Sequence, residues 1–271
     1  MSIPNSLIAE VCQNRRLIGK LAKNDIKTRF AGSYLGIIWA FIQPVVTVFI
    51  YWLVFGNGLK SGQSLDVPFL VYLVAGIVPW FYCQELMSTG TVCLLEYSYL
   101  VKKVVFNIRV LPVVKALSAL FVHVFFVLVA FVIAAIYGYY PNIYLLQLPY
   151  YYLAMLIFLL GLVYATCSIV IFFRDMSQIV GICLQFGVWS IPIMFDLRSF
   201  AHISWLFKIN PMYYIITGYR DAIYGRRWFF ERGFVTLYFW AFAIGAFLIG
   251  NVIFRRLRVH FMEVHELPER E

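Results

Sequence analysis

Residues 13–55 read QNRRLIGKLAKNDIKTRFAGSYLGIIWAFIQPVVTVFIYWLVF. In residues 13–30, cationic side chains recur at helical spacing and form one basic stripe: Arg16, Lys20, Lys23 and Lys27. The other side is mostly apolar, and Asp25 and Arg29 fall within it, four residues apart, so that they can pair with each other. After a short Ala-Gly-Ser break, residues 34–55 carry no charge and are long enough to cross a bilayer. We therefore expect an amphipathic helix in the lipid headgroups that leads directly into a membrane-spanning helix.

The rest of the chain has the composition of a helical membrane protein. Of 271 residues, 63% are hydrophobic and 13% are charged, which is far from the average of soluble domains. Six apolar segments approach the length that a bilayer requires: 34–55, 69–93, 112–138, 148–173, 177–195 and 234–254. The net charge of +9 is spread over these helices and suits anionic lipid headgroups better than nucleic acid. The sequence thus predicts an all-α membrane protein built as a single domain over residues 1–271.

The distribution of Lys and Arg predicts the orientation of the chain. Most of the 22 basic residues fall on the cytoplasmic side if both termini are cytoplasmic. The last outer segment, residues 196–233, is nevertheless basic, and Asn210-Pro211 within it is a helix-start signal. We expect two short re-entrant helices over residues 199–224. The pattern of apolar and basic residues over 96–108 predicts a short amphipathic cytoplasmic helix. This helix is either an anchor on the membrane surface or a docking site for a cytoplasmic partner.

Motifs for an energy source or for catalysis are absent from the sequence. It contains no phosphate-binding loop of the G-x-x-x-x-G-K-[ST] type and neither G-x-S-x-G nor H-E-x-x-H. The histidines are scattered and the cysteines lack metal-ligand spacing, so we expect no metal and no cofactor in this chain. Ionisable residues within the spans are scarce, which weighs against ion-coupled transport: Glu85, Lys115 and His123. Lys115 can reach from its span end towards the headgroups, and Glu85 can be held by a neighbouring polar group or by Arg29.

Two groups of residues are candidates for contact with a substrate. The basic stripe, with Arg29, either holds its helix on anionic lipid or recognises a phosphate, and the sequence leaves both interpretations open. Aromatic residues make up 19% of the chain. They either pack against lipid or line a path for sugars, because flat rings stack on pyranose faces. The candidates for such a path are Tyr34, Trp39, Phe41, Tyr51, Trp52, Phe81 and Tyr82.

An ordered series of short motifs resembles a known family. The series is Arg29-Phe30, Ser33, Leu35-Gly36, Trp39 and Pro44; Leu100-Val101-Lys102-Lys103 before Leu111-Pro112; Arg174-Asp175; Pro192-Ile193-Met194-Phe195; and Asn210-Pro211 with Arg220 ten residues further on. In order and spacing it looks like the ABC-2 type permeases that export polysaccharides, of the wall teichoic acid and O-antigen kind. Asn107 is a departure, because many members carry proline there, and the exact shape of the helix over 96–108 is therefore open.

The resemblance implies the type V ABC exporter fold and a homodimer of this chain in the bacterial cytoplasmic membrane. It implies two copies of a separate ATP-binding subunit that holds the ATP and magnesium, so that this chain is not itself an enzyme. Residues that would dock on that subunit are Tyr99, Leu100, Lys102, Lys103 and Phe106. The segment 13–30 would lie beside a lateral gate between the first and fifth spans. The implied substrate is a glycan linked to a polyprenyl (pyro)phosphate; the alternatives are an ABC-2 permease for a drug or lipid and an ion-coupled secondary transporter.

Overall fold

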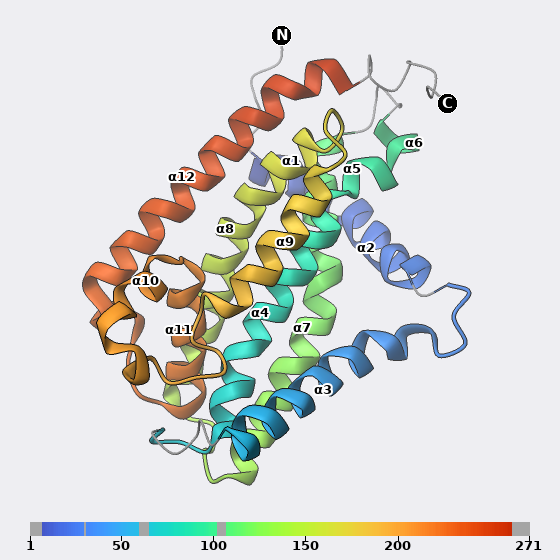
Figure 1. Cartoon of the computed structure of the whole chain (residues 1–271). Coiled ribbons are helices and arrows are strands. Elements are labelled where there is room, and N and C mark those ends of the chain that lie inside the picture. The colour runs from blue at the N-terminus through green and yellow to red at the C-terminus, as the bar shows by residue number, and fades with distance from the viewer. Residues whose placement is uncertain (1–6, 30, 60–64, 102–106, 262–271) are drawn as a thin grey trace.

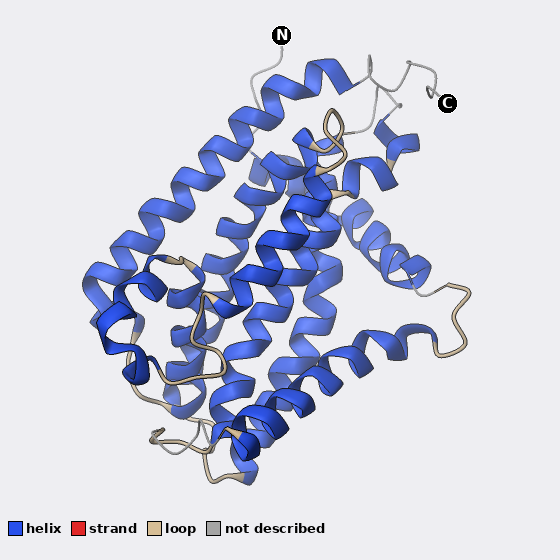
Figure 2. Cartoon of the chain, viewed as in Figure 1, coloured by secondary structure: helices blue, strands red, loops and turns tan. Residues whose placement is uncertain are grey.

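A computed structural model describes residues 7–29, 31–59, 65–101 and 107–261. Within these ranges the chain forms helices joined by loops and turns, without strands (Figure 2). Five helical segments are long and apolar enough to cross a membrane: Gly36–Gly58, Phe69–Thr91, Ile108–Ile136, Ile143–Ile169 and Phe229–His260. They contain the helices α3 (Trp39–Tyr51), α4 (Phe69–Thr91), α7 (Leu111–Ile136), α8 (Leu148–Ile169) and α12 (Gly233–Leu257). An all-helical protein with several membrane-spanning helices is therefore confirmed.

The sixth predicted span, residues 177–195, is shorter than expected. Its helix α9 covers Met176–Trp189, 14 residues, which extend over roughly 21 Å at 1.5 Å per residue against a hydrocarbon core of about 30 Å. The helix stops before Pro192, whose ring and missing N–H oppose its continuation. Residues 191–194 then form a buried turn outside regular helix. A full-length sixth span is thus not confirmed.

Helix α4 forms the centre of the bundle. It packs against α7, α8, α9 and α11, and most of its side chains are buried. Helix α12 packs along α8 at the outer side of the bundle (Figure 1). Helix α3, by contrast, has no buried residue and runs obliquely beside α4 and α7. Its sequence is nearly all apolar, so the first span leaves most of its surface for lipid or a partner chain.

The described segment between α9 and α12 contains two short α-helices where the sequence predicts two re-entrant ones, and their re-entry into the membrane stays a prediction. They are α10, Ser204–Ile209, which has no buried residue, and α11, Met212–Tyr224, which is largely buried. Helix α11 packs between α4 and α8 rather than forming an outer loop. Arg220 of α11 is only 4% exposed. Its guanidinium lies 3.5 Å from the ring centre of Tyr72 and donates to the carbonyl oxygens of Tyr72 (3.3 Å) and Ile193 (3.1 Å).

The predicted helix over 13–30 begins later than expected. Helix α1 (Leu7–Gln13) ends before Asn14, whose side-chain amide donates to the Glu10 carbonyl oxygen at 2.8 Å, and α2 follows over Arg15–Arg29. Phe30 lies outside the described residues. The apolar face of α2 packs on α7, where Ile18 and Ala22 are buried against Val110 and Val114. This face is thus covered mainly by the protein.

The predicted helix over 96–108 is not continuous. Helices α5 (Cys93–Glu96) and α6 (Ser98–Val101) are separated at Tyr97. At the far end Asn107 is extended, and its side chain caps the turn that follows by accepting from the Arg109 N–H. The described residues thus show the predicted helix interrupted at Tyr97 and extended backbone at Asn107, while residues 102–106 lie outside them. Tyr99 is exposed, whereas three of the predicted docking residues lie outside the described part of the chain: Lys102, Lys103 and Phe106. Of Leu100 only the helical backbone is described.

Candidate functional site

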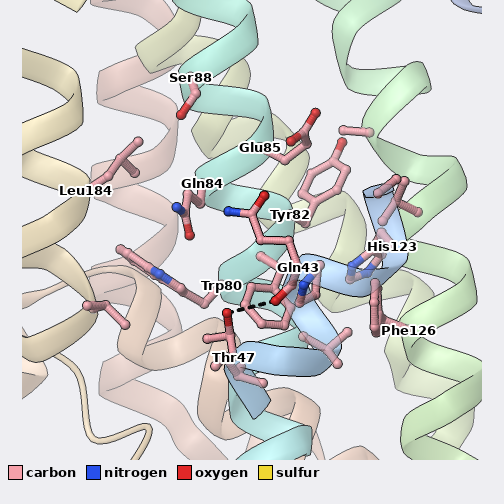
Figure 3. Close-up of a pocket in the computed structure, with 18 of the residues that line it drawn as sticks. Gln43, Thr47, Trp80, Tyr82, Gln84, Glu85, Ser88, His123, Phe126 and Leu184 are labelled. Atoms are coloured by element: carbon pink, nitrogen blue, oxygen red, sulfur yellow. Dashed lines mark hydrogen bonds between the residues drawn. The ribbon is translucent and has the colours of Figure 1, made fainter. Parts of the chain in front are cut away.

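A cavity of about 800 Å³ lies between α3, α4, α7 and α9, with the end of α2 at its edge (Figure 3). It is the strongest candidate for a substrate site, because ligand pockets in helical bundles form between helices and have volumes in this range. Helix α4 supplies one wall with residues 77–89, and the exposed helix α3 supplies the opposite one. The cavity thus lies between α4, which is mostly buried, and α3, which has no buried residue.

Side-chain amides enter this cavity from three helices. Gln43 comes from α3, Gln84 from α4 and Gln185 from α9. Two hydroxyls lie one helical turn beyond these amides. Thr47 on α3 donates to the main-chain carbonyl oxygen of Gln43 at 2.9 Å, and Ser88 is on α4. An amide can both donate and accept hydrogen bonds. The lining therefore suits a ligand that carries many hydroxyl groups.

Four of the seven predicted aromatic residues line the cavity: Trp39, Tyr51, Phe81 and Tyr82. The other three lie elsewhere. Tyr34 is fully exposed, Phe41 packs against Phe125 of α7 with ring centres 4.4 Å apart, and Trp52 lies near Phe49 on α3. Two indoles that the sequence analysis did not single out, Trp80 and Trp189, also line the cavity.

The amides of the cavity were also missed as site residues. Their signal was present, because an uncharged polar side chain in an apolar span is costly unless it has a partner or a ligand. Gln43, Gln84 and Gln185 each interrupt such a span. Periodicity alone could not show that the three amides face the same space.

Arg29 and Glu85 form an ion pair between the end of α2 and α4 at the edge of the cavity. Arg29 was one of the partners expected for Glu85, and the structure confirms it. A pair between Asp25 and Arg29 within one helix was also expected, whereas the Asp25 carboxylate binds Lys115 and Tyr97. The side chains of Arg29 and Glu85 are 28% and 33% exposed, so the pair is accessible from the cavity.

Asp25 instead belongs to a buried cluster that holds α2 against the bundle. Its carboxylate accepts from Lys115 Nζ of α7 at 2.6 Å and from the Tyr97 hydroxyl at 2.9 Å. Lys115 also contacts Glu96 at 2.5 Å. Burial raises the pKa of the Asp25 carboxyl, but the hydrogen bonds and charge of Lys115, with Tyr97, outweigh it and bring the pKa below its usual value. Lys115 is 3% exposed, so the expectation that it reaches towards the headgroups is wrong.

His123 has a local partner inside the bundle. Its Nε2 lies 2.9 Å from the Tyr219 hydroxyl of α11, and its ring stacks on Tyr152. Glu85 is paired with Arg29 and His123 Nε2 is bonded to the Tyr219 hydroxyl, and both side chains also line the cavity.

The basic stripe lies outside the cavity. Arg16, Lys20, Lys23 and Lys27 are all exposed on α2, on the side that faces away from α7. Of the five residues predicted to recognise a phosphate, only Arg29 lines the cavity. The stripe and the cavity therefore meet at the last residue of α2.

An integral membrane bundle with a polar cavity between its helices is an arrangement that membrane transport proteins use. The sequence pattern of the ABC-2 type transporter family matches residues 16–224. The chain belongs to this family, which is that of the permease subunits of ABC transporters.

Curated relatives include permeases for polysaccharides. The chain is 27% identical over 224 residues to the O-antigen export system permease protein RfbA of Myxococcus xanthus, which covers 82% of this chain and 85% of the relative. It is 23% identical over 251 residues to the permease of the same name from Klebsiella pneumoniae (92% and 94%). It is 24% identical over 237 residues to the polysialic acid transport protein KpsM of Escherichia coli (85% and 89%).

Proposed function

We propose that this chain is the permease subunit of an ATP-driven exporter of cell-envelope polysaccharide linked to a polyprenyl (pyro)phosphate, of the O-antigen or teichoic acid type. The observation that carries the proposal is the cavity lining, where amides and hydroxyls alternate with indole and phenol rings. Rings that stack on pyranose faces and amides that bond hydroxyls are the chemistry that recognises sugars. The relatives named for polysaccharide transport support the same substrate class.

In this proposal the chain acts as a homodimer with two ATP-binding subunits, which bind the ATP and magnesium. Both termini are cytoplasmic. This agrees with the fold, where α1, α5, α6 and the end of α12 gather at one end of the bundle (Figure 1). Helix α9 and the buried turn after it together make the sixth crossing, and α10 and α11 lie towards the outer leaflet. The substrate enters laterally beside α3 and α9, which both contribute to the cavity wall.

Purification of the tagged chain from its native membrane tests the proposal. We expect an ATP-binding subunit to co-purify at one copy per permease chain, and the complex to hydrolyse ATP faster when lipid-linked glycan is supplied. A permease that transports such a glycan without any ATP-binding subunit would contradict the proposal. Stimulation by amphipathic drugs but not by lipid-linked glycan would instead favour a drug permease.

The basic stripe gives a second test of the proposed substrate. Replacing Lys27 by Gln should lower the affinity for anionic lipid-linked substrate about fivefold, because one cation near a charged surface contributes about 1 kcal/mol. The measurement is the substrate concentration that gives half-maximal ATP hydrolysis, taken at low salt. Thr28→Ala, a neutral change at an exposed neighbouring site, is the control. An unchanged half-maximal concentration would mean that the stripe only anchors the helix.

A further inference from the structure

The ion pair between Arg29 and Glu85 stands where the basic helix meets the cavity. Arg29 is the last residue of α2, and Glu85 lies in the middle of α4. Among the described residues that line the cavity, Arg29 is the only Lys or Arg. An anion that moves from the exposed stripe into the cavity therefore meets one fixed cation, and that cation is already bound to a carboxylate.

A guanidinium binds a carboxylate and a phosphate through the same pair of parallel N–H donors. The Glu85 carboxylate takes up the Arg29 Nη1 donor, which a phosphate oxygen could otherwise accept from. Both side chains are half-buried, so water is partly excluded while a ligand can still reach them. Gln84 and Ser88 on α4, and Gln43 on α3, line the cavity around this pair.

We propose that Arg29 is the phosphate-binding residue of the cavity and that Glu85 is the resident carboxylate which the phosphate of a membrane lipid displaces. The nearby amides and Ser88 then face the first sugar attached to that phosphate. This inference rests on the proposed function and gives it a substrate-selecting residue. A lipid without phosphate cannot displace Glu85, so Glu85 selects against neutral lipids.

If phosphate displaces Glu85, substitutions of Arg29 and of Glu85 should change phosphate binding in opposite directions. If the pair is formed in nine of ten substrate-free molecules, the apparent affinity for a phosphate is about tenfold weaker than that of an unoccupied Arg29. Removing Glu85 should therefore strengthen phosphate binding, whereas removing Arg29 should abolish it. A pair that only ties α2 to α4 would respond in the same direction to both changes.

The experiment measures binding of undecaprenyl phosphate to the full chain in phosphatidylcholine nanodiscs by the fluorescence of its tryptophans, of which Trp39, Trp80 and Trp189 line the cavity. Undecaprenol, which has the same chain without phosphate, measures the contribution of the phosphate. Glu85→Gln should bind undecaprenyl phosphate about tenfold more tightly than the unchanged chain. Arg29→Gln and the double variant should bind it no better than undecaprenol. Arg15→Gln, at the exposed start of the same helix, should match the unchanged chain.

Further arms separate the sources of the phosphate. Phosphatidylglycerol and inorganic phosphate are tested against undecaprenyl phosphate. If either binds as tightly as undecaprenyl phosphate, and only when Arg29 is present, the subsite is supported and its ligand is bilayer lipid or free phosphate, respectively. Weaker binding by Glu85→Gln, or equal binding of undecaprenol and undecaprenyl phosphate by the unchanged chain, would overturn the inference. Neither result would affect the proposed export function, which fails separately if no ATP-binding subunit co-purifies.

Discussion

Replacement of Lys115 by Met should lower the free energy of unfolding by about 3 to 5 kcal/mol, because it leaves the Asp25 carboxylate buried without its cation. Lys115 and Asp25 are 3% and 5% exposed, and their charged atoms lie 2.6 Å apart. The change keeps the apolar stem of the side chain and removes only the charge. Thermal unfolding in detergent measures the effect, and limited proteolysis within residues 15–29 reports release of α2.

Three further variants test whether the loss of stability comes from the Asp25–Lys115 ion pair. The double variant Asp25→Asn with Lys115→Met should regain most of the loss, because neither charge is then left unpaired in the interior. Glu96→Gln should cost under about 1 kcal/mol, since the Glu96 side chain is 48% exposed and water screens its contact with Lys115. Lys20→Met, at an exposed position of α2, is the control. Equal stability of Lys115→Met and Lys20→Met would show that the cluster does not hold α2.

The pairing of Asp25 with Lys115 also marks the limit of what the sequence could predict. Length and hydropathy placed five spans, because a segment of about 20 apolar residues has few alternatives to a bilayer. Helical spacing predicted the exposed basic stripe, since periodicity is a local property. Asp25 and Lys115 are 90 residues apart. The choice between Arg29, one turn away, and a distant lysine depends on how α2 packs on α7, which no local pattern encodes.

Helix α11 shows a second limit of the same kind. Its one arginine, Arg220, was counted among the charges of a basic outer segment, because counts of Lys and Arg treat every cation as solvated. Arg220 is instead buried against the Tyr72 ring and two carbonyl oxygens. Gly76 on α4 makes room for it, because a Cβ atom there would lie 2.6 Å from the Arg220 Nη2 atom. The cavity amides were missed for a related reason, because their convergence arises only when α3, α4 and α9 are packed together.

The second large effect is expected at the crossing of α8 and α12, where two glycines bring the helix backbones together. A Cβ atom on Gly250 of α12 would overlap the Gly161 carbonyl oxygen of α8 and lie 2.9 Å from the carbonyl carbon. A Cβ atom on Gly161 would lie 2.5 Å from the Phe247 backbone nitrogen. Ala246 and Gly250, four residues apart on α12, form the small-xxx-small pattern that lets membrane helices pack closely.

Gly250→Ala should therefore destabilise the protein by about 3 kcal/mol, at the upper end of what overpacking costs. The obstacle is backbone, which cannot rotate aside as a side chain can, so the two helices must separate. Within a membrane their contact depends on close packing rather than on the hydrophobic effect, and separation loses that packing along the crossing. Thermal unfolding of the purified chain measures the loss.

Gly245→Ala provides the matched control for this prediction. It makes the same change on the same helix, but a Cβ atom there meets nothing within 4 Å. Alanine favours helix over glycine by about 1 kcal/mol, so this variant should be as stable as the unchanged chain or slightly more stable. If both alanine variants unfold at the same temperature, the α8–α12 crossing can accommodate a methyl group at residue 250. Close approach of the two backbones would then not be what stabilises this side of the bundle. If only Gly250→Ala unfolds at a lower temperature, the packing of α12 on α8 depends on the close backbone approach that Gly161 and Gly250 allow.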